Sequence, residues 1–79
     1  MNTTVGVADP SVVLDHLEKA KRHVATGEGL LARQRALIAD LRRVGEDTAA
    51  SEALLAQLEE AQASSLAEVA RLKNELGRR

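Results

Sequence analysis

Apolar and small residues recur along most of the chain at alternating steps of four and three positions. The first series comprises Val13, Leu17, Ala20, Val24, Gly27, Leu31, Gln34, Ile38 and Leu41. The second series comprises Ser51, Leu55, Leu58, Gln62, Ser65, Val69, Leu72 and Leu76. Heptad spacing of this kind places a narrow stripe on one face of an α-helix, as in coiled coils. The pattern therefore predicts two long helices, and it contains no strand.

Residues that start and stop helices delimit the two series. Asp9 can cap the free amide groups of a helix that begins at Pro10, because proline suits the first helical position. Gly45 suits the end of this helix, since it tolerates positive φ, and Asp47 or Thr48 can cap the next helix. We predict a flexible N-terminal arm at 1–8 and a helical hairpin at 9–77, with helices at 9–44 and 48–77 joined by a turn at 45–48.

Two glycines, Gly27 and Gly29, are the main objection to one long first helix. Each costs roughly 1 kcal/mol relative to alanine in a helix interior. The apolar phase is nevertheless the same before and after them, whereas a loop would shift it. We expect a continuous helix with a weak point, and a kink at Gly27–Gly29 is the alternative.

The short turn makes the two helices antiparallel neighbours, so their register can be predicted. We predict that Gln34 and Gln62, the only glutamines of the stripe, share one layer, where their amides can bond to each other. Such a polar layer lowers stability and fixes the register. The same register pairs Leu41 with Leu55, Ile38 with Leu58, Leu31 with Ser65, Gly27 with Val69, Val24 with Leu72 and Ala20 with Leu76. A shift by one heptad is rejected because it would set each glutamine against a leucine.

The two edges of the stripe differ in character. One edge pairs Arg42 with Glu52 and Arg35 with Glu59. The other edge carries aliphatic residues near the turn: Leu30, Leu37, Val44, Leu54 and Ala61. Single surface leucines are normal, but contiguous apolar strips typically mark contacts, and a two-helix hairpin offers these residues no partner. Two hairpins that pack their strips together would form a four-helix bundle, and another protein is an equally suitable partner.

Composition narrows the chemistry that the chain can perform. There is no cysteine for a disulfide or thiolate metal site, and His16 and His23 lie about 10 Å apart on a helix, too far for one metal ion. A two-helix rod has no concave pocket, so we predict no enzyme activity and no cofactor. Neither a signal peptide nor a transmembrane span is recognisable, which favours a soluble cytoplasmic protein with no membrane partner.

Nucleic-acid binding is a further hypothesis, because the first helix is net basic. The second helix is net acidic, so mutual attraction of the helices is the simpler explanation. The chain has no aromatic residue to stack on bases, no basic region ahead of a zipper, and a net charge of −1. This hypothesis therefore ranks last.

The segment from His23 to Thr48, together with the later ALLAQLEEAQ, resembles a group of short uncharacterised proteins common in alphaproteobacteria. The matching residues are His23, Val24, Gly27, Glu28, Arg33, Gln34, Gly45, Asp47, Thr48, Leu54, Leu55 and Gln62. The similarity covers roughly residues 16 to 76 and departs near Ser65 and over Val69–Lys73. It implies an antiparallel hairpin in a bacterial cytoplasm. The group has no established activity, so the resemblance implies no function.

Taken together, the residues predict an all-α, coiled-coil-like antiparallel two-helix hairpin that pairs into a four-helix bundle. The corresponding function is that of a non-enzymatic interaction or structural protein that forms a homodimer through the aliphatic residues. The alternative is a small regulator or inhibitor that docks on a larger protein complex. The turn residues Gly45, Asp47 and Thr48 are expected to shape the turn first, and an exposed tip there is a weaker candidate for partner binding.

Overall fold

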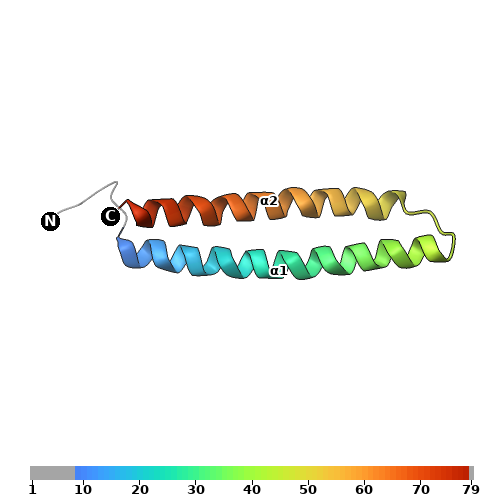
Figure 1. The fold of residues 1–79 in the computed structure, drawn as a ribbon, viewed down its shortest axis with the longest axis horizontal. Helices are drawn as coiled ribbons and strands as arrows, with labels where there is room; N and C mark the ends of the chain where they lie inside the picture. Colours follow the sequence, from blue (N-terminus) through green and yellow to red (C-terminus); the bar gives the residue numbers. More distant parts are fainter. Residues whose placement is uncertain (1–8, 79) are drawn as a thin grey trace.

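The computed structural model describes residues 9–78 and shows two long antiparallel α-helices joined by a short turn (Figure 1). Helix α1 spans Pro10–Arg43 and helix α2 spans Ala49–Gly77. No strand occurs within this described part of the chain. The predicted all-α hairpin is therefore confirmed, and each predicted helix end lies within one residue of the observed one. The arm predicted at 1–8 lies outside the described residues.

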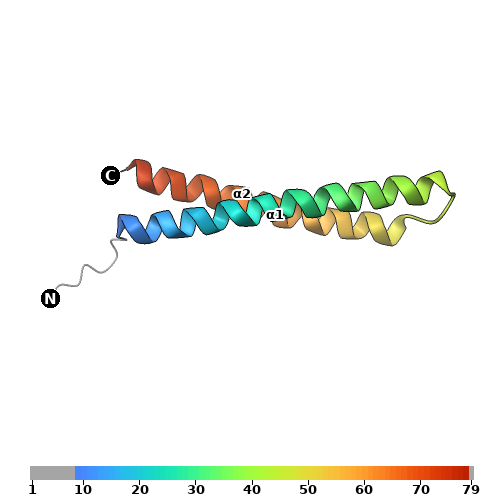
Figure 2. The same ribbon diagram turned by 90° about the horizontal axis from the view of Figure 1, so that it is seen from below.

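The start of α1 follows the predicted capping chemistry. Asp9 has an extended backbone, and its carboxylate accepts hydrogen bonds from the Ser11 amide at 2.9 Å and from the Ser11 hydroxyl at 3.0 Å. Pro10 occupies the first helical position, where no hydrogen bond from its nitrogen is required. The helix then continues through Gly27 and Gly29 as one element, and the ribbon shows no sharp bend (Figure 2). The continuous helix is thus the correct alternative, and the kink is not observed.

The end of α1 is closed by a pair of backbone hydrogen bonds around Gly45. The Gly45 amide donates to the carbonyl of Arg42 at 3.1 Å, and the Glu46 amide donates to the carbonyl of Leu41 at 2.8 Å. This pattern requires a left-handed backbone at the first residue after the C-cap, and that residue, Gly45, has φ +78°. The glycine therefore stands where only a residue without a Cβ avoids strain, as predicted.

The start of α2 divides its capping between two neighbouring residues. Thr48 occupies the N-cap position but makes no side-chain bond to a helix amide. The carboxylate of Asp47 accepts from the Ala49 amide at 3.0 Å, and the Thr48 hydroxyl donates to Glu52 at 2.7 Å. Of the two predicted caps, Asp47 satisfies the backbone, and Thr48 orients the first acidic residue of the helix.

Burial follows the heptad stripe at every position that was predicted. In α1, Val13, Leu17, Ala20, Leu31 and Ile38 are buried, and Val24, Gly27, Gln34 and Leu41 are half-buried. In α2, Gln62 and Leu72 are buried, and Ser51, Leu55, Leu58, Ser65, Val69 and Leu76 are half-buried. Buried residues form an apolar cluster at the open end of the hairpin, where Val69 and Leu76 pack against Val13, Leu17, Ala20 and Leu72.

The predicted register is wrong by one heptad. Gln62 packs against Gly27, and its amide donates to the carbonyl of Val24 at 3.0 Å. Gln34 donates instead to the carbonyl of Ser51 at 2.9 Å. The layer of Gln34 with Gln62 is therefore not formed, and each amide is satisfied by the backbone of the other helix. At the open end the same shift places Leu72 in the cluster with Leu17 and Ala20, rather than opposite Val24 as predicted.

The length and direction of the connection explain this shift. Residues 46–48 are not helical, and three such residues can span up to about 10 Å, which is roughly the length of seven helical residues. Figure 1 shows α1 extending farther toward the turn than α2, with the connection running back. Helix α2 thus begins about one heptad farther from the tip than the predicted register would place it. In this register Gln62 faces a glycine rather than a leucine, and the missing side chain leaves room for the amide.

Candidate interaction surface

The five aliphatic residues predicted as a contact strip all lie exposed on one edge of the hairpin. Hereafter this apolar edge means Leu30, Leu37, Val44, Leu54 and Ala61. The exposed fraction is 42% for Leu30, 45% for Leu37 and 46% for Leu54, and it reaches 63% for Val44 just beyond the end of α1. Ala61 is exposed as well. Because these residues recur every seven positions on both helices, they form a continuous strip beside the stripe.

A shallow hollow opens along this edge, and the sequence did not predict it. It encloses about 180 Å³ and is lined by His23, Thr26, Gly27, Leu30, Leu58, Ala61, Gln62 and Ser65. Gly27 contributes no side chain, so the space beside Gln62 stays partly unfilled. Small-molecule sites usually enclose about 300–1,000 Å³, so the hollow is better sized for one or two side chains than for a ligand. A glycine at a stripe position was the signal for it.

Toward the open end, the side of the hairpin that carries the apolar edge has ionisable instead of aliphatic side chains. His16 and His23 continue the heptad positions of Leu30 and Leu37 on α1, and Glu68 lies beside both histidines at a second shallow hollow. Glu75 follows Glu68 by one heptad on α2. Hereafter His16, His23, Glu68 and Glu75 are called the ionisable segment of the edge.

Arg71 pairs with both glutamates of the ionisable segment from the outer side of α2. Its guanidinium donates to Glu68 at 2.7 Å and lies 3.6 Å from Glu75. The hydrogen bond from Arg71 lowers the pKa of Glu68, and the same bond raises the pKa of Arg71. Glu68 is therefore held in its charged form beside the histidines.

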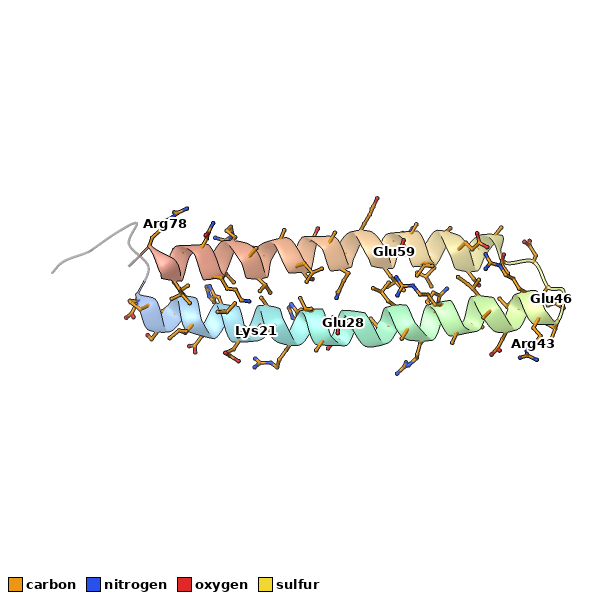
Figure 3. All side chains as sticks on the ribbon, viewed as in Figure 1. Lys21, Glu28, Arg43, Glu46, Glu59 and Arg78 are labelled. Carbon is orange, nitrogen blue, oxygen red and sulfur yellow. The ribbon has the colours of Figure 1, made fainter. Side chains whose placement is uncertain are left out.

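The opposite edge carries the two predicted ion pairs between the helices. The guanidinium of Arg35 lies 3.3 Å from the carboxylate of Glu59, which is labelled in Figure 3. The guanidinium of Arg42 lies 2.8 Å from the carboxylate of Glu52. The hydrogen bond from the Thr48 hydroxyl, followed by the bond from Arg42, lowers the pKa of Glu52. Both pairs form although the core register differs from the predicted one. The two ion pairs therefore do not distinguish the observed register from the predicted one.

Other large apolar residues are exposed singly. Val12 and Leu14 are 45% and 48% exposed near the start of α1, and Leu66 is 50% exposed on α2. Leu66 shares its heptad position with Glu59 and Lys73, so charged residues flank it along the helix. Isolated apolar residues of this kind are common on protein surfaces and do not form a strip.

Three further properties bear on the classes of function. Within residues 9–78, no three side chains of metal-binding type come together. Neither α1 nor α2 combines the length and apolar character needed to span a membrane. A scan against models of protein families, a search of curated proteins and a search of solved structures each found no match to this chain. The resemblance described above stays a prediction.

Proposed function

We propose that this chain is a non-enzymatic interaction protein that self-associates through its apolar edge into a homodimeric four-helix bundle. The observation that supports the proposal is the contiguous exposure of the apolar edge beside an incompletely buried part of the stripe. Near the turn, the stripe residues Leu41, Leu55 and Leu58 are only half-buried. A second hairpin would cover both sets of side chains at once.

A second copy is a suitable partner because it carries the same strip. In a dimer with two-fold symmetry, one surface patch packs against itself, so an aliphatic patch is automatically complementary to its copy. Full burial of an exposed leucine or valine contributes about 1.5–3 kcal/mol, and the side chains of the apolar edge are already about half covered. Each then contributes about 1 kcal/mol on association. We therefore expect a dimer that dissociates on dilution.

The test is the molar mass in solution over a concentration series, by light scattering or sedimentation equilibrium. The proposal expects about twice the chain mass of 8.5 kDa at high concentration. Leu37→Glu should shift the mass to that of a single chain, because it places a charge within the strip. Leu66→Glu is the matched control, since Leu66 is 50% exposed in a helix interior but lies off the apolar edge.

Any of three results would overturn the proposal. One is a single-chain mass for the unmodified protein at every concentration, which would leave the apolar edge for a different protein. The second is an unchanged dimer mass for Leu37→Glu, and the third is an equal loss of mass for Leu37→Glu and Leu66→Glu. In that case the apolar edge would not be the specific contact.

A further inference from the structure

On the side of the hairpin that carries the apolar edge, the type of side chain changes along the helices and also differs between the two helices. Along its length it is aliphatic near the turn and ionisable near the open end. Across its width, the histidines of the ionisable segment belong to α1 and the glutamates belong to α2. The whole helices follow the same division. Helix α1 has seven Lys and Arg against four Asp and Glu, whereas α2 has two against five.

Two hairpins can stack this edge against its copy about two different two-fold axes. An axis parallel to the helices puts both turns at the same end and lays α1 of each chain on α2 of the other. An axis perpendicular to the helices, lying between the two hairpins and parallel to their planes, puts the turns at opposite ends and lays α1 on α1. Both arrangements bury the same type of surface, so the distribution of side chains must distinguish them.

In the same-end arrangement, complementary side chains face each other over the full length of the hairpin. It places aliphatic half on aliphatic half, basic helix on acidic helix, and the histidines of one chain opposite the glutamates of the other. The opposite-end arrangement at full overlap places leucines on ionisable residues and a basic helix on a basic helix, which is unfavourable. Sliding the chains until only the aliphatic halves overlap avoids the first conflict but gives up the remaining contact area.

We infer that the homodimer is a same-end bundle in which α1 of each chain packs on α2 of its partner. This inference rests on the proposed self-association and specifies its geometry. The observed register places Leu37 and Leu54 at one level of the hairpin, so the bundle contains a layer of four leucines. The next layer combines Leu30 and Ala61 of both chains. There Leu30 of one chain lies over the small Ala61 of the other, at the rim of the Gly27 hollow.

The distance between the two open ends tests the arrangement directly. The chain has no cysteine, so Arg78→Cys provides a unique site for a spin label. Arg78 is exposed at the open end of the hairpin (Figure 3). In the same-end bundle, neighbouring helix axes are about 8–10 Å apart, so the two α2 helices, which lie on a diagonal, are roughly 11–14 Å apart. Each label extends outward from its helix by several ångströms, so pulsed electron paramagnetic resonance should give about 20–30 Å between labels. In the opposite-end bundle the labels are separated along the helices by at least about 45 Å, from the rise per residue.

The results separate failure of the geometry from failure of self-association. A dimer mass with a label distance of about 20–30 Å supports the same-end bundle. A dimer mass with a distance above about 45 Å overturns the same-end bundle and leaves the proposed self-association standing. A single-chain mass overturns both. The control is the label in the Leu37→Glu background, where the distance between chains should disappear along with the dimer.

Discussion

Two glycines in one helix allow the observed register to be tested with a matched pair of substitutions. Gly27 and Gly29 both lie inside α1, so replacing either with alanine brings the same gain in helix propensity, about 1 kcal/mol. At Gly29 a new Cβ meets no atom within 4 Å. Gly29→Ala should therefore stabilise the hairpin by about 1 kcal/mol. The variants differ only in what the added methyl group contacts on the other helix.

At Gly27 the added methyl group meets the side-chain oxygen of Gln62, which must then move. Gln62 is only 8% exposed, and its amide donates to the carbonyl of Val24. Losing that hydrogen bond costs about 1 kcal/mol, and leaving a buried amide without a partner costs about 1–3 kcal/mol. These losses offset or exceed the gain in propensity. We expect Gly27→Ala to be neutral or destabilising by up to about 2 kcal/mol, hence about 1–3 kcal/mol below Gly29→Ala.

Thermal unfolding followed by circular dichroism measures this difference. For a chain of this size, 1 kcal/mol corresponds to a shift of about 4–8 °C in Tm. All variants must be compared at one chain concentration, because association would make Tm concentration-dependent. Equal stabilisation by the two substitutions would refute the reasoning, because Gln62 could not then lie on Gly27. In a Gln62→Ala background the obstacle is absent, so Gly27→Ala should recover its gain.

Two further predictions concern the turn and the response to acid. Gly45→Ala should destabilise the hairpin by about 1–2 kcal/mol, because φ at Gly45 is +78°, and the expected fall in Tm is about 4–8 °C per kcal/mol. Gly77→Ala, at a position without positive φ, is the control, and equal effects would contradict the role of the turn. Hydrogen bonds from the Thr48 hydroxyl and the Arg42 guanidinium lower the pKa of Glu52 below the ordinary value of 4.5, and the bond from the Arg71 guanidinium lowers the pKa of Glu68 in the same direction. Their contribution to stability is therefore complete above that pH and is lost as the pH falls through the lowered values, so Tm should decrease as the pH falls below the ordinary value. The double variant Glu52→Gln with Glu68→Gln should show a shallower decrease, and an unchanged slope would exclude these two groups as its cause.

The heptad spacing alone was sufficient to predict which residues of both helices are withdrawn from solvent. A helix has a fixed period, so the stripe from Val13 to Leu41 and that from Ser51 to Leu76 each had only one face to bury. The register could not be obtained in the same way. A shift by one heptad returns every stripe residue to the same face, so periodicity does not distinguish the two alternatives.

Two local features decide the register, and neither is periodic. The connection from Glu46 to Thr48 runs back along α1 (Figure 1), a path that depends on the backbone conformation after Gly45 as well as on the number of residues. The position at Gly27, which has no side chain, receives Gln62, so the expectation that a shift by one heptad sets both glutamines against leucines is wrong for Gln62. The choice between Asp47 and Thr48 as cap was open for a related reason, since both side chains can accept from a helix amide.

The position of the buried apolar cluster has a mechanical consequence. Helix α1 begins and helix α2 ends at the same end of the hairpin (Figure 1), so a force pulling these two helix ends apart would open the layers one at a time. The first layers to carry this load contain Val13, Leu17 and Leu72, whose side chains are among the most deeply buried. The covalent turn holds the far end, where the layers are less well covered. The best-buried layers thus lie at the end where forced separation of the helices would begin. Rupture of those first layers should therefore set the rate of forced opening.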